Sequence, residues 1–129
     1  MKPIGWLAAI ALVAGLLIVA SLIDEGQRSG ASDRSASIVL DDRRFVPNRL
    51  DAKVGVPLVV RLTNQGLERH DLNFPSLHMP GHEGVESILE AGESRTITLT
   101  FDQPGTHTFI CSLPGHAASG MTGVVFVRP

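Results

Sequence analysis

Short β-branched segments bounded by turn residues dominate the sequence after residue 36. The segments "ASIVLDD", "LVVRLTN", "RTITLTF", "THTFIC" and "GVVFVR" alternate roughly between apolar and polar residues, as half-buried strands do. Between them stand "KVGVP", "NQG", "EAGES" and "DQPG", in which glycine and proline favour turns. This spacing predicts an all-β, antiparallel sandwich or barrel of about seven to eight strands. The irregular stretch 75–87 leaves a short helix open.

An uncharged run of 20 residues, from Ile4 to Ile23, precedes the predicted strands. As a helix it would be about 30 Å long, enough to cross the hydrocarbon core of a bilayer. A cleaved signal peptide is the alternative, but its apolar core usually spans only about 7 to 15 residues. We therefore expect residues 1–23 to form one N-terminal transmembrane helix that anchors the chain, or a signal peptide. Residues 24–36 are polar and small, as in a flexible linker, and residues 37–129 form the folded domain.

Charge predicts the orientation of this anchor. Lys2 precedes the uncharged run, and Asp24 and Glu25 follow it, so the domain is expected on the extracytoplasmic, periplasmic side of the membrane. A cleaved N-terminus would leave a secreted or periplasmic protein. Without Lys2, the chain has 10 Lys and Arg residues and 13 Asp and Glu residues, a net charge of −3. That balance offers no basic surface for nucleic acid.

The only cysteine, Cys111, stands in "FICSLPGHAASGM" with His116 five residues later and Met121 five residues after that. Outside the cytoplasm a lone cysteine forms no intrachain disulfide, so it is a buried thiol or a ligand. Side chains alternate along a strand, so Cys111 shares a face with Phe109. The glycines and the proline of the following loop allow it to fold back and return His116 and Met121 to the same end of the domain.

A second histidine comes from another segment of the chain. In "RHDLNF", His70 alternates in phase with Leu72 and Phe74, which directs its side chain inward. One thiolate, two imidazoles and one thioether are the ligand set of a blue-copper electron-transfer site. The ordinary alternative for Cys111 is a small core side chain, and Met121 can fill the core in the same way. The spacing of the three residues in one loop favours the ligand interpretation.

The motif resembles a known family. "FICSLPGHAASGM" followed by "GVVFV" is similar to the C-terminal signature of the cupredoxins, small blue copper proteins that include plastocyanin, azurin and rusticyanin. "FVPNRLDAKVGVPLVVRLTNQGLERHDLNF" is similar to their segment that leads to the first histidine, so the resemblance covers residues 38–128. It implies a Greek-key β-sandwich that holds one type 1 copper ion, cycling between Cu(I) and Cu(II). The implied metal ligands are His70, Cys111 and His116 in the equatorial plane and Met121 on the axis.

Two residues depart from the family pattern. His107 stands where many members have a tyrosine, and we expect it to be a buried, hydrogen-bonded structural histidine. Asp71 follows the first histidine, where members often carry an uncharged polar residue. A carboxylate there disfavours further negative charge near copper.

The resemblance implies an electron carrier that works with redox protein partners, has no small-molecule substrate and is not an enzyme. The uncharged N-terminal run adds the expectation that this carrier is tethered to the membrane. Copper enzymes of this fold place a catalytic copper between two such domains, and this chain has room for one. A two-copper electron-entry site needs two cysteines, and the chain has one. An apolar surface formed by Pro114, Ala117 and Ala118 around His116 is expected to dock the partners.

The alternative function is an extracytoplasmic copper-binding protein for copper tolerance or delivery. "LHMPGHEG" contains His78, Met79, His82 and Glu83, a set suited to a second, weaker metal site. We favour the simpler interpretation that both histidines are solvated loop residues.

Overall fold

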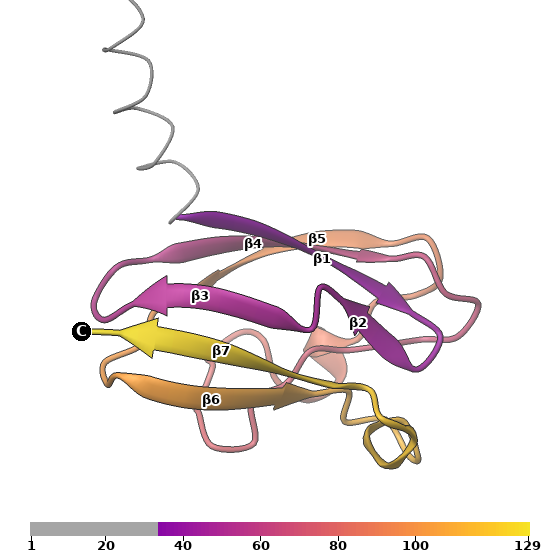
Figure 1. The fold of residues 1–129 in the computed structure, drawn as a ribbon. Helices are drawn as coiled ribbons and strands as arrows, with labels where there is room; N and C mark the ends of the chain where they lie inside the picture. The colour runs from indigo at the N-terminus through magenta and orange to yellow at the C-terminus, as the bar shows by residue number, and fades with distance from the viewer. Residues whose placement is uncertain (1–33) are drawn as a thin grey trace, which may run out of the picture. The chain divides into compact units, whose positions relative to one another are not determined.

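Seven strands form two facing sheets in the computed structural model, which describes residues 34–129 (Figure 1). One sheet has the strand order β2-β1-β4-β5 and the other the order β3-β7-β6. Two short 3₁₀ turns, η1 (Gly84–Ser87) and η2 (Ala117–Ser119), lie in connections between strands. The strands are β1 (Ser35–Asp41), β2 (Arg44–Val46), β3 (Arg49–Lys53), β4 (Leu58–Asn64), β5 (Ser94–Leu99), β6 (Gly105–Ile110) and β7 (Thr122–Arg128).

The core lies between the two sheets and follows the predicted alternation. In β4 the residues Leu58, Val60 and Leu62 are buried, while Val59 and Arg61 between them are exposed. Aromatic rings fill the middle: Phe74 packs against Phe101 and Phe109 with ring centroids 5.8 and 5.7 Å apart. The prediction of an all-β sandwich of about seven strands is therefore confirmed for the residues that the structure describes.

The expectation of purely antiparallel strands is wrong for two pairs. β1 pairs with β4, and β3 with β7, in parallel register. After β1 the chain reverses direction, and the returning segment is divided between the two sheets. Its first part, β2, runs antiparallel to β1, and its second part, β3, belongs to the other sheet. β4 consequently re-enters the first sheet in the direction of β1. Alternation of apolar residues reports which face of a strand is buried and carries no information about direction.

The elements also differ from the sequence prediction in detail. β2 and β3 fall in a stretch where alternation alone delimits no strand, because β2 has three residues and the buried positions of β3 are only Leu50 and Ala52. The short helix left open in 75–87 is the 3₁₀ turn η1. β1 begins at Ser35, two residues before the expected start of the domain.

The predicted anchor at 1–23 and most of the linker lie outside the described residues. Within residues 34–129 no helix is long and apolar enough to cross a membrane.

His82 is part of the core rather than a solvated loop residue. Its side chain is buried, and its Nε2 lies 3.0 Å from the carbonyl oxygen of Leu72. Burial lowers the pKa of His82, and the hydrogen bond to Leu72 opposes this effect only in part. The expectation of solvation does hold for His78, whose side chain is 78% exposed and lies with Nδ1 2.9 Å from Glu83 Oε1.

His82→Gln tests this burial through pH. Glutamine keeps an N–H donor for Leu72 and does not titrate. Because the pKa of His82 is lower in the folded chain than its ordinary value of 6.5, protonation favours unfolding, and stability present above pH 6.5 declines as the pH falls toward the folded-state pKa. In urea unfolding of the copper-free protein at about pH 7.5 and about pH 5, wild type should lose more unfolding free energy than the variant. An equal loss in both proteins contradicts the assignment.

Candidate metal centre

A buried asparagine at the end of β4 shapes the segment that carries His70. The Asn64 amide nitrogen donates to the carbonyl oxygens of Glu68 (2.8 Å) and Leu89 (3.0 Å). Its amide oxygen accepts from the N–H of Gly66 at 2.9 Å. His70 then pairs with Leu89 in a short antiparallel bridge, with its N–H 3.2 Å from the Leu89 carbonyl. These bonds turn the fully buried His70 side chain toward the interior of the sandwich.

Cys111 follows directly on β6, next to the same segment. Asn73 and Ile110 exchange two backbone hydrogen bonds of 2.9 and 2.8 Å. One residue beyond Cys111, the N–H of Ser112 donates to Asp71 Oδ1 at 2.6 Å, and the Ser112 hydroxyl donates to Asp71 Oδ2. These links join the residues beside His70 to the residues beside Cys111.

The β6–β7 loop returns to the strand from which it starts. The N–H of Cys111 donates to the Met121 carbonyl at 3.1 Å, and the N–H of Met121 donates to the His116 carbonyl at 3.1 Å. Gly115 and Gly120 have φ of 81° and 100°, in the left-handed region that favours glycine. The predicted return of His116 and Met121 to the end of β6 is thus made by backbone hydrogen bonds and two glycine turns.

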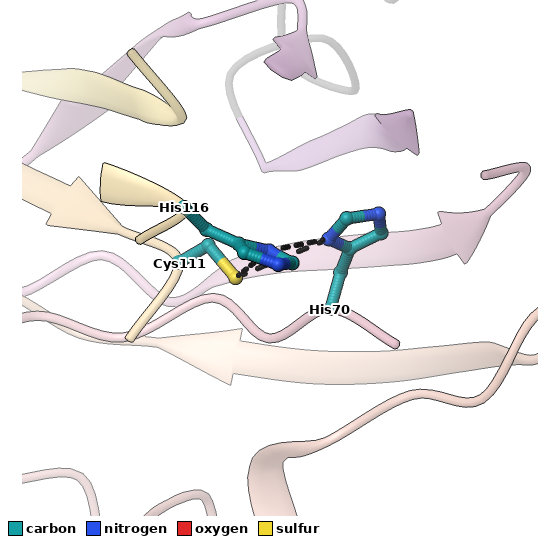
Figure 2. Close-up of side chains that lie close together, drawn as sticks. All are labelled: His70, Cys111 and His116. Atoms are coloured by element: carbon teal, nitrogen blue, oxygen red, sulfur yellow. Dashed lines mark hydrogen bonds between the residues drawn. The ribbon is translucent and has the colours of Figure 1, made fainter. Parts of the chain in front are cut away.

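The side chains of His70, Cys111 and His116 point toward one another (Figure 2). The two Nδ1 atoms lie 3.2 Å apart, and Cys111 Sγ lies 3.3 Å from His116 Nδ1 and 4.0 Å from His70 Nδ1. Of the described residues, these three form the only group of at least three His, Cys, Asp or Glu side chains whose ligand atoms all lie within 4.8 Å of one another. All three are buried.

This donor set fits copper. Imidazole nitrogen and thiolate sulfur with a weak axial thioether are the donors of a blue-copper centre. Ligand atoms about 2.0 to 2.3 Å from one ion and spread around it in a plane are separated by roughly 3.5 to 4 Å, and the three distances lie close to that range. Met121, the expected axial ligand, is fully buried. Its backbone is hydrogen-bonded to the backbone of both Cys111 and His116, which places it next to this group.

The Cys111 thiol lies in surroundings that disfavour its ionised form. Burial raises its pKa, the backbone N–H groups of Asp71 and Leu113 lower it, and the Asp71 carboxylate raises it further. A bound metal cation reverses this balance because a coordinating thiol is deprotonated. Asp71 thus acts on the thiol in both directions, because its backbone N–H lowers the pKa and its carboxylate raises it.

The outer ring nitrogen of each histidine meets a carboxylate that sequence reasoning missed. His70 Nε2 lies 3.3 Å from Asp42 Oδ1, and His116 Nε2 lies 3.2 Å from Glu68 Oε2. Metal-bound histidines typically donate their other N–H to such a group, which fixes the ring. Asp42 stands 28 residues from His70, and no periodicity in the sequence connects them.

The other histidines do not join the group. His78 and His82 make separate contacts, with Glu83 and Leu72 respectively. His107 is hydrogen-bonded as expected, with Nε2 3.2 Å from the Gln103 carbonyl, but it is half-buried rather than buried. Its ring packs against Phe101 at a centroid distance of 5.0 Å.

Two curated proteins are similar in sequence. Auracyanin-B of Chloroflexus aurantiacus is 44% identical over 58 residues, which are 45% of this chain and 25% of that protein. The chain therefore spans about a quarter of the length of this relative. The copper-resistant cuproprotein CopI of Pseudomonas aeruginosa is 24% identical over 145 aligned positions, which cover 79% of this chain and 80% of that protein.

Solved structures share the fold. A dithionite-reduced auracyanin from Roseiflexus castenholzii superposes with a TM-score of 0.65 at 22% identity, over 76% of this chain and 99% of that chain. A multicopper oxidase superposes with a TM-score of 0.65 at 24% identity, over 74% of this chain and 42% of that chain. The family model of the cupredoxin-like domain matches residues 9–125. The chain belongs to the cupredoxin-like family, and its relatives in that family bind copper.

Proposed function

We propose that this protein is a membrane-tethered type 1 blue copper protein that carries single electrons between redox protein partners outside the cytoplasm. Its ligands in this proposal are His70, Cys111, His116 and Met121. The observation that carries the proposal is their burial: His70, Cys111 and Met121 have no exposed surface, while His116 is 8% exposed. One ligand therefore reaches the surface from an otherwise closed site, which suits exchange of electrons better than binding of a substrate.

The residues around the site hold its ligands in place. Bound copper supplies a couple that gains and loses one electron. The chain supplies rigidity, because backbone hydrogen bonds fix Cys111, His116 and Met121 relative to one another and the Asn73–Ile110 bridge fixes the segment of His70. A site that is already formed changes little between the two charge states of the ion, which favours fast transfer.

The surface around His116 has an apolar part and a charged part. Pro114 and Ala118 are exposed and Ala117 is half-buried. Glu68 lies with Oε2 3.2 Å from Nε2 of the His116 ring and pairs with Arg43 at 3.9 Å. Small, partly apolar surfaces suit the brief encounters of redox proteins. We therefore assign partner docking to this end of the domain.

Tethering rests on the uncharged run from Ile4 to Ile23, with Lys2 before it and acidic residues after it. This arrangement supports an anchor with the copper domain on the periplasmic side.

The proposed role is not enzymatic. The chain covers 42% of the multicopper oxidase whose structure it resembles, and its single cysteine supplies one thiolate. The residues that the structure describes form one such domain, whereas an enzyme of this fold builds its catalytic copper between two.

Copper tolerance or delivery is the second candidate, favoured by the similarity to CopI across most of both chains. If copper handling uses a second copper site, His78, Met79 and His82 must bind that copper together. The contacts of these residues oppose that, because His82 is buried and hydrogen-bonded to the Leu72 carbonyl oxygen, and His78 pairs with Glu83.

Copper stoichiometry separates the two roles. An electron carrier should bind one equivalent of copper per chain in equilibrium dialysis. Two reversible equivalents would favour copper handling.

Ala118→Glu tests the docking surface. The added charge lies on exposed surface two residues from His116 and opposes the approach of a second copy, so we expect electron self-exchange, measured by nuclear magnetic resonance line broadening, to slow about tenfold. The visible spectrum should stay unchanged. Thr100→Glu is the matched control, because this exposed residue follows β5 at the end of the sandwich away from Asn64. Equal rates in both variants would contradict the assignment of His116 as the exit point for electrons.

A further inference from the structure

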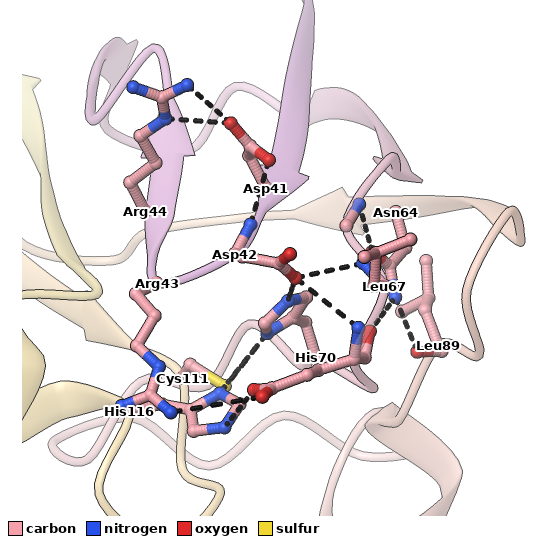
Figure 3. A network of polar contacts seen from close by, with 12 residues as sticks. Asp41, Asp42, Arg43, Arg44, Asn64, Leu67, His70, Leu89, Cys111 and His116 are labelled. Carbon is pink, nitrogen blue, oxygen red and sulfur yellow. Dashed lines mark hydrogen bonds and ion pairs between the residues drawn. The ribbon is translucent and has the colours of Figure 1, made fainter.

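One carboxylate oxygen joins the β1–β2 turn to the segment that carries His70. Asp42 Oδ1 accepts from the N–H of Leu67 at 2.9 Å and from the N–H of Glu68 at 3.3 Å, and it lies 3.3 Å from His70 Nε2 (Figure 3). The three donors are 25 to 28 residues away in the sequence. Asp42 therefore fixes both the backbone before His70 and the ring itself.

Gly66 makes this contact possible. A Cβ atom at this position would lie 2.4 Å from Asp42 Oδ1 and 2.9 Å from His70 Nε2, and real Cβ atoms essentially never approach within 3.0 Å. The N–H of Gly66 is also held by Asn64 Oδ1 at 2.9 Å. The loop is thus built so that backbone without a side chain passes directly against the pair of Asp42 and His70.

The contact determines which nitrogen of His70 faces the metal centre. An ionised carboxylate only accepts hydrogen bonds, so His70 Nε2 carries the proton that it shares with Asp42. Nδ1, which lies 3.2 Å from His116 Nδ1 and 4.0 Å from Cys111 Sγ, is then directed at the site. A histidine whose outer N–H meets a carboxylate is also a more basic ligand.

Asp42 adds negative charge behind a ligand that is itself fully buried. Negative charge near the metal stabilises the doubly charged ion more than the singly charged one. Glu68 is placed in a similar way behind His116, and its side chain is 50% exposed, close to the 42% of Asp42, but Glu68 pairs with Arg43, whose positive charge offsets its own. Of the two carboxylates, Asp42 is expected to have the larger effect.

We propose that Asp42 is a positioning residue, admitted by Gly66, that orients His70 toward the metal and biases bound copper toward Cu(II). This inference rests on the proposed copper function. It adds a residue and a direction of tuning that the ligand set alone does not give.

Asp42→Asn separates charge from structure, because the amide oxygen retains an acceptor of similar size. In the copper-loaded full chain, we expect the ratio of Cu(II) to Cu(I) affinity to fall about tenfold, which raises the midpoint potential by about 59 mV for one electron. The matched control is Asp102→Asn, which removes the same charge from an exposed position. Asp102 follows Phe101, whose carbonyl oxygen accepts the N–H of Gly55 at the end of the sandwich away from Asn64. Equal potentials in both variants overturn the electrostatic role.

Gly66→Ala tests the positioning with all charges retained. Displacement of Asp42 from His70 should lower copper affinity by about 10-fold to 100-fold and shift the visible spectrum. Wild-type affinity and spectrum in this variant overturn the role of Gly66.

A measurement without metal keeps the proposal testable where a variant fails to fold or wild type fails to bind copper. In the copper-free wild-type protein, nitrogen-15 resonance spectra should show a proton on His70 Nε2 that exchanges slowly with solvent, and Asp42→Ala should lose that protection. An unprotonated Nε2 in wild type overturns the positioning role. Wild-type protein that shows this proton but develops no blue colour with copper would contradict the proposed function and leave the orientation by Asp42 supported.

Discussion

The contact between two distant segments, residues 70–73 after β4 and residues 110–112 at the end of β6, is the constraint on which the metal centre depends. His70 and Cys111 are 41 residues apart in the sequence. Asp71 joins them from a buried position, because its carboxylate accepts the N–H and hydroxyl of Ser112 immediately after Cys111. Two backbone hydrogen bonds between Asn73 and Ile110 extend the contact between the two segments. Without this contact, the two histidines and the thiol would not share one end of the sandwich.

The contact between the two segments also has an electrostatic consequence. Asp71 is buried beside a thiol whose pKa is raised by burial and raised further by that carboxylate, so the site without metal favours a neutral sulfur. Asp42 and Glu68 place further carboxylates behind the two histidines. Carboxylates gathered around a buried group of ligands favour a cation among them, although Arg43 offsets the charge of Glu68. The surroundings of the site thus suit a positively charged occupant as well as its ligands do.

The sequence predicted the parts of this arrangement that depend on local pattern. Alternation placed Phe109 on the buried face of β6 with Cys111 beyond it, and it directed His70 inward, because side chains of a strand point to opposite faces with period two. The glycines of the loop after Cys111 predicted that it folds back. The resemblance to the cupredoxins, carried by the motif from Cys111 to Met121, is confirmed by the match of the family model to residues 9–125.

The parts that depend on tertiary contact were not predictable in this way. Asp42 and Glu68 look like ordinary surface acids in the sequence, and only the folding of the β1–β2 turn against the loop after β4 brings Asp42 to His70. His82 resembled a solvated loop residue because its neighbours are glycine, proline and charged residues, yet the loop folds back and buries it on Leu72. The direction of β4 was missed because it is determined by the crossing from β2 to β3, and strand pattern is insensitive to direction.

The most direct test of the account is the electronic spectrum of the oxidised, copper-loaded protein, recorded together with its electron paramagnetic resonance spectrum and compared with Cys111→Ser. A type 1 site predicts intense blue absorption and narrow copper hyperfine splitting in wild type, both lost in the variant because serine supplies no thiolate. A colourless wild-type protein, or the broad splitting of ordinary cupric sites, would contradict the proposed ligand set and make Cys111 a core thiol or a ligand for Cu(I) alone.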